Sequence, residues 1–154
     1  MKASFLIFAV VDLLMLALTA AMGLMIDGRS GYARHVLLGV LAGLFTCFVH
    51  VVVYMYFVVQ SKIIEQAIEH DSLDARYYTQ VGGLRTRTFR CSMAGIFTIL
   101  LTAGLGASID TGVSPNWHLL AAMASMFIEG GLFFVQFTTL DDYRGVFREA
   151  FGEE

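Results

Sequence analysis

The chain has 154 residues, of which 57% are hydrophobic and 15% are charged, and its mean hydropathy is +0.70. Soluble domains average about 45–50% apolar and about 25% charged residues, so the composition argues against a soluble globular enzyme and against a disordered chain. A net charge of -3 argues against a nucleic-acid-binding protein, and two cysteines are too few for a disulfide scaffold.

Four stretches are long, apolar and nearly free of charge: residues 3–26, 36–59, 91–108 and 117–140. A helix needs about 20 apolar residues to cross a bilayer, and the stretches lack the alternation of a membrane β-barrel. We therefore predict an all-α integral membrane protein, a single domain over residues 1–154 that packs four transmembrane helices as an up-down-up-down bundle. The first stretch is longer than the apolar region of a signal peptide, so we expect it to be retained.

The basic residues are divided unevenly between the two sides of the predicted membrane domain. With four spans, both termini and the middle loop share one side, which carries eight of the ten Lys and Arg residues. The other side carries Arg29 and Arg34. Because cytoplasmic loops are enriched in Lys and Arg, we predict that both termini are cytoplasmic, and we place the chain in a bacterial inner membrane.

The segment between the second and third spans, residues 60–90, is the longest polar part of the chain. Its apolar residues recur at helical spacing, which predicts that the second helix continues beyond the membrane as an amphipathic rod to about His70. Ser72 would cap a short further helix that ends at Gly82 and Gly83. This cytoplasmic segment would anchor at the lipid headgroups or, alternatively, dock an anionic lipid or a partner subunit.

The sequence contains none of the common catalytic motifs. GxSxG, the P-loop, HExxH and CxxC are all missing from it. Whether the chain is an enzyme therefore stays open, and we expect that it does not act as one on its own. The residues that could carry chemistry are the histidines and the carboxylates inside the predicted spans, because ionisable groups at membrane depth need partners or a role.

A first candidate site lies near the outer surface. The second and fourth spans run in the same direction, so His35 and His118 at their starts share a depth. Gly39 and Gly43 follow His35 at helical spacing and could leave a slot for a b-type haem with both imidazoles as axial ligands, while Arg34 could meet a propionate. Alternatively, the two glycines are a packing motif and the histidines are interfacial side chains.

This arrangement resembles that of cytochrome b subunits, in which two parallel helices carry histidines near both sides of the membrane. His35 and His50, 15 positions apart, resemble such a pair on one helix. The fourth span departs from the pattern, since it offers Leu132 and Phe133 at the depth of His50. The resemblance, which is architectural, implies at most one bis-histidine haem.

A second candidate site lies in the inner half of the bundle. Asp12, His50 and Glu129 fall at similar distances from the cytoplasmic ends of three spans, so we expect them to face the bundle interior in one layer. Four interpretations follow: a structural hydrogen-bonded network in which His50 pairs with one carboxylate and the other is protonated, a contact of Asp12 or Glu129 with a partner subunit, a proton or ion path, and a site for iron, manganese or zinc.

Three functional hypotheses remain open. The first is a small membrane subunit of a larger electron-transfer complex that holds one haem b between the second and fourth helices, with other membrane subunits or a second copy of the chain as partners. The second is an accessory subunit without a cofactor, which suits a small chain without a catalytic motif. The third is a bundle that conducts protons or ions through the inner polar layer.

Overall fold

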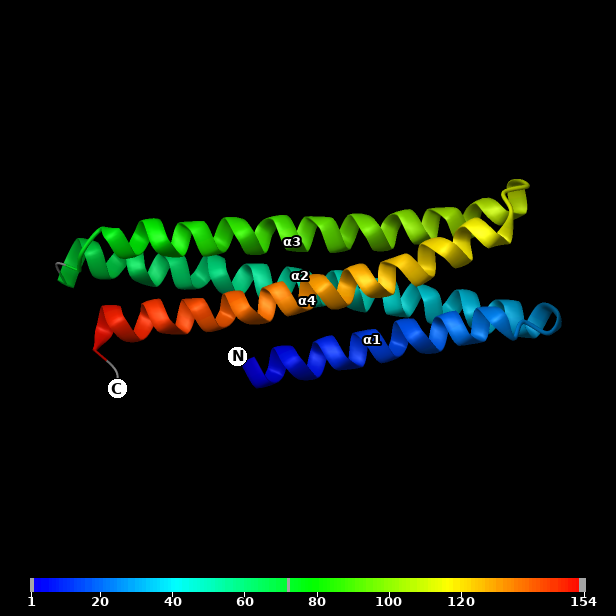
Figure 1. The fold of residues 1–154 in the computed structure, drawn as a ribbon, viewed down its shortest axis with the longest axis horizontal. Helices are drawn as coiled ribbons and strands as arrows, with labels where there is room; N and C mark the ends of the chain where they lie inside the picture. Colours follow the sequence, from blue (N-terminus) through cyan, green and yellow to red (C-terminus); the bar gives the residue numbers. More distant parts are fainter. Residues whose placement is uncertain (1, 72, 153–154) are drawn as a thin grey trace.

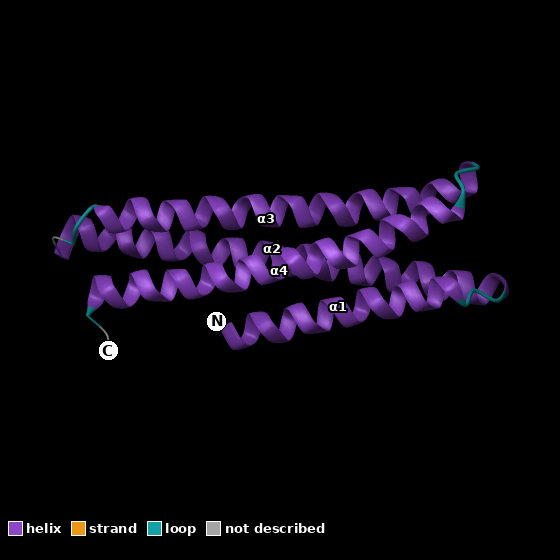
Figure 2. Cartoon of the chain, in the orientation of Figure 1, coloured by secondary structure: helices purple, strands orange, loops and turns teal. Residues whose placement is uncertain are grey.

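The computed structural model describes residues 2–71 and 73–152, and these residues form helices and short loops without any strand (Figure 2). The elements are α1 (Lys2–Leu24), α2 (Gly28–Asp71), α3 (Arg76–Ala107), a 3-10 turn η1 (Ser108–Thr111) and α4 (Pro115–Phe151). Each of the four long helices is long and apolar enough to cross a membrane. Successive helices run in opposite directions (Figure 1).

The helices pack as a ring in which α1 and α3 each contact both α2 and α4. The distribution of polarity is inverted relative to that of a soluble bundle. Large apolar side chains cover the outside, and Leu14, Phe97 and Phe127 are 64%, 67% and 79% exposed. A soluble protein rarely shows so much contiguous apolar surface, so this surface is the one expected to face lipid.

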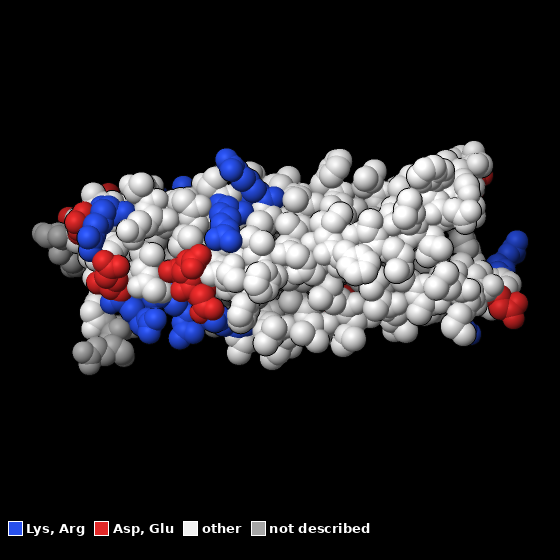
Figure 3. All heavy atoms as spheres, viewed as in Figure 1, with Lys and Arg blue, Asp and Glu red and all other residues white. Residues whose placement is uncertain are grey.

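Charged side chains gather at the end of the bundle that carries the C-terminus, while a broad central band of the visible face is uncharged (Figure 3). Ion pairs between helices link Lys2 with Asp141, Arg87 with Asp142 and Arg76 with Glu149. Exposed pairs of this kind are each worth about 1 kcal/mol or less. They do not hold the bundle together, but they identify the end that favours water.

At this end α2, α3 and α4 extend beyond the start of α1 (Figure 1). The prediction that the second helix continues to about His70 is confirmed, since α2 ends at Asp71. The extension has its own core: Tyr77, Val81 and Tyr143 are buried, and the Tyr143 hydroxyl donates to Gln60 Oε1 at 2.9 Å. Burial raises the pKa of the Tyr143 phenol.

The predicted stop at Gly82 and Gly83 is wrong, because both residues lie inside α3, which runs without a break to Ala107. The proposed cap, Ser72, lies outside the described residues. The glycines lower helix propensity, but Tyr77 and Val81 on the preceding turns are buried against the neighbouring helices. Tertiary packing outweighs a propensity cost of about 1 kcal/mol for each glycine.

Gly82→Ala is expected to stabilise the protein. A Cβ on Gly82 would meet no atom within 4 Å, and alanine restricts the unfolded chain more than glycine does. We expect a gain of roughly 0.5–1 kcal/mol, seen as a higher melting temperature in detergent. Gly112→Ala is the matched control and should lower the melting temperature, because Gly112 has φ 98 at the end of η1. A lower melting temperature for Gly82→Ala would contradict the continuous α3.

Candidate functional site

The outer site is a pair of histidines that meet across the bundle. His35 on α2 and His118 on α4 have ring centroids 6.0 Å apart, with ring planes at 76°. Each Nδ1 lies within hydrogen-bond distance of a backbone carbonyl, 3.1 Å from Thr19 O and 3.0 Å from Thr102 O. Because a carbonyl only accepts, each Nδ1 carries the proton, and Nε2 keeps the lone pair. Metal-ligating histidines are oriented in this way.

Two glycines make the space for these rings. A Cβ built on Gly23 of α1 would lie 2.9 Å from Cε1 of His35, and a Cβ on Gly106 of α3 would lie 2.9 Å from Cε1 of His118. A side chain at either position would displace the imidazole from its carbonyl. Both histidines are part-buried, so backbone on the neighbouring helix, rather than a deep cavity, fixes how the rings lie.

The two halves of the site repeat one another in the sequence. Each histidine follows a threonine by 16 positions and a glycine by 12, and the second set lies 83 positions after the first. Pairs of residues related by the same offset also meet at two deeper levels. Contacts between equivalent positions are expected where a two-fold axis passes, so α1–α2 and α3–α4 are related by a pseudo-two-fold axis along the bundle. The three pairs are His35 with His118, His50 with Phe133, and Gln60 with Tyr143.

Both histidines were predicted from the sequence, but this repeat was not, and neither were the supporting threonines and glycines. The signal was present as the pattern Thr-x3-Gly-x11-His, which occurs at Thr19 and again at Thr102. A comparison of the chain with itself at a fixed offset would have shown it. The pattern spans a loop and two helices, so a search of single helical faces does not detect it.

The predicted slot below His35 is arranged differently from the expectation. Gly39 and Gly43 were expected to open toward α4, yet a Cβ on Gly39 would lie 3.5 Å from Thr19 Cγ2 of α1, and one on Gly43 would lie 3.2 Å from Ile99 Cγ2 of α3. The two glycines therefore let α1 and α3 approach α2, which is the packing role of small residues in membrane helices.

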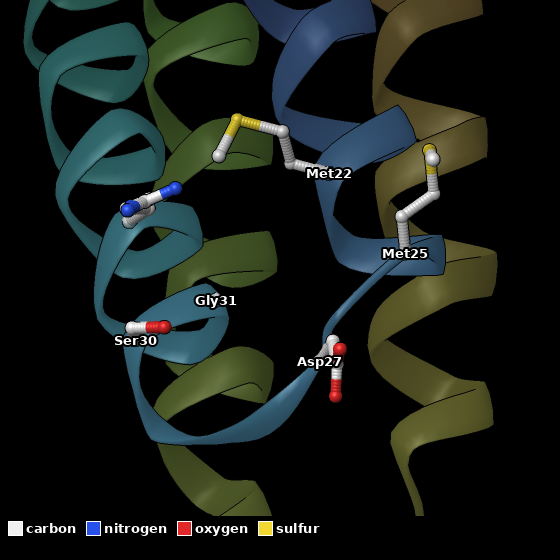
Figure 4. A pocket seen from close by; sticks show the side chains of 6 residues that line it. Met22, Met25, Asp27, Ser30 and Gly31 are labelled. Atoms are coloured by element: carbon white, nitrogen blue, oxygen red, sulfur yellow. The ribbon is translucent and has the colours of Figure 1, made fainter.

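Arg34 is exposed next to His35 and lines a surface pocket of about 390 Å³ at the α1–α2 connection. Figure 4 shows Met22, Met25 and Asp27 around this pocket. Met22 directly precedes Gly23, so the pocket adjoins the backbone that supports the His35 ring. A guanidinium at this place could bind a carboxylate or phosphate at the mouth of the site.

The inner candidates Asp12, His50 and Glu129 are each fully buried, in agreement with the expectation that they face the bundle interior. His50 Nε2 lies 2.8 Å from Glu129 Oε2. Asp12 is held separately, because Thr46 donates to its Oδ1 at 2.8 Å. Within residues 2–71 and 73–152, His50 thus pairs with Glu129 and not with Asp12.

The fourth helix adds a residue that the sequence analysis missed. Gln136 is fully buried, and its Nε2 lies 3.1 Å from His50 Nδ1 and 3.1 Å from Ser92 Oγ. Ser92 in turn donates to the His50 backbone carbonyl at 3.0 Å. Gln136 stands seven positions after Glu129, two helical turns, so the helical period of α4 was the signal that could have found it.

The inner layer is a hydrogen-bonded network in this structure. Among residues 2–71 and 73–152, no three His, Cys, Asp or Glu side chains lie close enough to hold a metal ion together. Four buried oxygens have no hydrogen-bond partner within the same part of the chain: Asp12 Oδ2, Thr88 Oγ1, Glu129 Oε1 and Gln136 Oε1. Buried polar atoms without partners are costly, so these oxygens mark where a proton or a water would be stabilised.

In comparisons of the chain with protein-family models, curated proteins and solved structures, nothing matches it. The class of protein therefore follows from the chain itself. It is an all-helical protein whose four long helices can each span a membrane, with a histidine pair at one end and a buried polar network between the helices.

Gly95→Ala tests the inner network. A Cβ on Gly95 would overlap the His50 imidazole. The imidazole cannot move aside without losing its hydrogen bond to Glu129 or to Gln136. We expect a loss of about 1–3 kcal/mol, measured as thermal unfolding in detergent. Gly104→Ala in the same helix is the control, because a Cβ there meets nothing within 4 Å. Equal melting temperatures for the two variants would contradict the close approach of α3 to His50.

Proposed function

We propose that this chain is a small integral membrane protein that binds one b-type haem between His35 and His118 and serves as the electron-transfer subunit of a larger membrane complex. The observation that carries the proposal is the pair of imidazoles, each held by a backbone carbonyl through Nδ1 and each leaving Nε2 for a ligand.

The spacing of the two rings fits a shared metal. An imidazole nitrogen binds a metal at about 2 Å, so two rings on opposite sides of one metal have centroids about 6 Å apart. The rings of His35 and His118 have this separation, 6.0 Å. His35 and His118 would each hold a haem iron through Nε2, and the haem would supply reversible one-electron chemistry.

The protein's own contribution would be to fix these ligands. The carbonyls of Thr19 and Thr102 hold each ring in one tautomer and one rotation, and Gly23 and Gly106 keep the adjacent backbone close. Bonds from Nδ1 to carbonyls also make the imidazoles better donors toward a metal. Arg34 at the neighbouring pocket would offer a cation to a propionate.

The membrane setting of the proposal rests on the surface. The uncharged central band and the charged end suggest a chain that spans the bilayer with both termini in the cytoplasm, and we place it in a bacterial inner membrane. The histidine pair would then lie near the outer surface. Partners in electron transfer would be other membrane subunits or a second copy of the chain.

A cofactor-free accessory subunit is the second candidate. It is favoured by Gly39 and Gly43, whose closest neighbours Thr19 and Ile99 show tight helix packing where the haem slot was expected. In that case the histidine rings would contact one another directly, and their role would be to join α2 and α4.

A haemochrome assay separates these two functions. We expect the full chain, purified from haem-replete cells, to show a reduced-minus-oxidised spectrum of a six-coordinate b-type haem. His35→Ala and His118→Ala should each abolish that spectrum, because the ligands come from different helices. His70→Ala, at an exposed position near the end of α2, should leave it unchanged. A purified chain without a Soret band would exclude the haem and favour the accessory subunit.

Reporter fusions test the proposed orientation. Alkaline phosphatase fused after α4 should be inactive in bacterial cells, and a fluorescent protein at the same place should fold, because we expect the C-terminus in the cytoplasm. The same reporters inserted between α3 and α4, near Gly112, should show the opposite pattern. Active phosphatase at the C-terminus would invert the orientation and place the histidine pair on the cytoplasmic side.

A further inference from the structure

The buried network around His50 is a second place where chemistry could occur, and it is separate from the pair of His35 and His118. His50 is fully buried and uses both ring nitrogens. Nε2 lies 2.8 Å from Glu129 Oε2 and Nδ1 lies 3.1 Å from Gln136 Nε2. An amide nitrogen only donates, so His50 Nδ1 accepts and Nε2 carries the proton. The ring is therefore neutral in the arrangement that the structure records.

The charges of this layer do not balance in that arrangement. Asp12 and Glu129 are both fully buried, and a neutral His50 compensates neither of them. Leaving two carboxylates ionised in a low-dielectric interior is costly, so such groups acquire protons or cations. One oxygen of each carboxylate, Asp12 Oδ2 and Glu129 Oε1, lacks a hydrogen-bond partner among the described residues.

We propose that His50, Glu129 and Gln136 form a proton-binding site inside the bundle, which the orientation of the Gln136 amide switches between a neutral and a protonated His50. A solvent hydronium gives up a proton and becomes water as its O–H bond breaks, and an N–H bond forms at the lone pair of His50 Nδ1. The imidazolium then faces the Glu129 carboxylate. Half a turn of the Gln136 amide brings Oε1 to the place of Nε2, where it accepts from Nδ1. No other covalent bond forms or breaks.

The surroundings of Gln136 allow this turn. In the structure Ser92 Oγ accepts from the amide nitrogen and donates its one proton to the His50 backbone carbonyl. After the turn that proton can be donated to the amide oxygen instead, so Ser92 exchanges one hydrogen bond for another. The amide atom that faces away from His50 has no partner within the described residues, so the turn sacrifices no hydrogen bond there. The Phe133 ring stacks on His50 with centroids 5.1 Å apart, and an aromatic face attracts a cation.

The titratable groups that face His50 from the helices packed around it are two carboxyl groups and a thiol. α1 presents Asp12, α2 has the half-buried thiol of Cys47, and α4 presents Glu129. α3 contributes Ser92 and the glycine Gly95, neither of which titrates. The charged groups that face His50 are thus carboxylates, and both favour its protonated form.

A proton fits this site better than a metal or alkali cation. The His50 ring occupies the space that a side chain at position 95 would fill, so the site has no room there for a further ligand. The hydrogen-bond partners of the two carboxylates among the described residues are one hydroxyl, from Thr46, and one imidazole nitrogen, from His50, whereas a hard cation needs about six oxygen ligands around it. The site does not depend on the proposed haem, which would sit between other residues.

Histidine ¹⁵N NMR of the full chain in lipid nanodiscs tests the proposal, because imidazole shifts distinguish both neutral tautomers and the cation. Titration from about pH 5 to about pH 9 should show the His50 signal change from the cation to the Nε2–H tautomer in one step. Glu129→Gln should lower the proton affinity of His50 by roughly tenfold or more, because it removes the charge beside Nε2. His50→Gln assigns the signal.

Ser125→Ala is the matched control, since Ser125 is buried one turn before Glu129 but its hydroxyl donates to the Ala122 carbonyl. It should leave the His50 midpoint unchanged. A His50 that keeps one protonation state throughout the titration would overturn the proposal. A midpoint unaffected by Glu129→Gln would overturn the role of the pair. A midpoint that moves when sodium replaces choline at constant ionic strength would indicate a cation site instead.

Discussion

The apolar exterior of the bundle is the constraint on which the other features depend. Four helices expose large hydrophobic side chains over most of their length, so a polar side chain has no water on the outside to satisfy it. Ionisable side chains within the spans are therefore expected to face inward and find partners on other helices. Asp12 bonds to Thr46, and His50 bonds to Glu129. Both contacts join different helices, so they fix how the helices are rotated, which apolar packing alone specifies weakly.

The pseudo-two-fold axis gives the two candidate sites different characters. Near the end with η1 the halves agree: His35 and His118 have the same threonine and glycine at the same spacing, which gives the pair two matched ligands. In the inner layer the halves differ, because the offset of 83 pairs His50 with Phe133 and Asp12 with Gly95. The first half of the chain supplies the His50 imidazole. The second half supplies Phe133, whose ring stacks on it, and Gly95, which leaves room for it. A symmetric site suits one shared ligand, and an asymmetric one suits a directed hydrogen-bond network.

How much the sequence could predict depends on the range of the interactions involved. The spans and the inward direction of Asp12, His50 and Glu129 follow from hydropathy and helical period, which are local properties. The pairing of His50 with Glu129 rather than Asp12 depends on helix rotation, and therefore on long-range contacts such as Gly95 against His50. Gly82 and Gly83 misled the prediction for the same reason, because local propensity suggested an end that the packed faces of α3 override. Each copy of the Thr–Gly–His pattern is short in the sequence but extends over two helices. A search of single helical faces therefore does not find it, whereas a comparison of the two halves of the chain does.

The separation of the two sites limits how far they can influence each other. His35 and His50 are 15 residues apart on α2, or about 22 Å along the helix. Two unit charges at that distance interact by about 0.7 kcal/mol at an effective dielectric constant of 20. A change of charge at the histidine pair would therefore move the proton affinity of the inner network by about threefold at most. Strong coupling would require movement of α2 itself, and the contacts of Thr46 with Asp12 and of His50 with Glu129 resist such movement. The proposed electron transfer at one end and the proposed proton binding in the inner layer are thus separable, and a variant that loses one should keep the other.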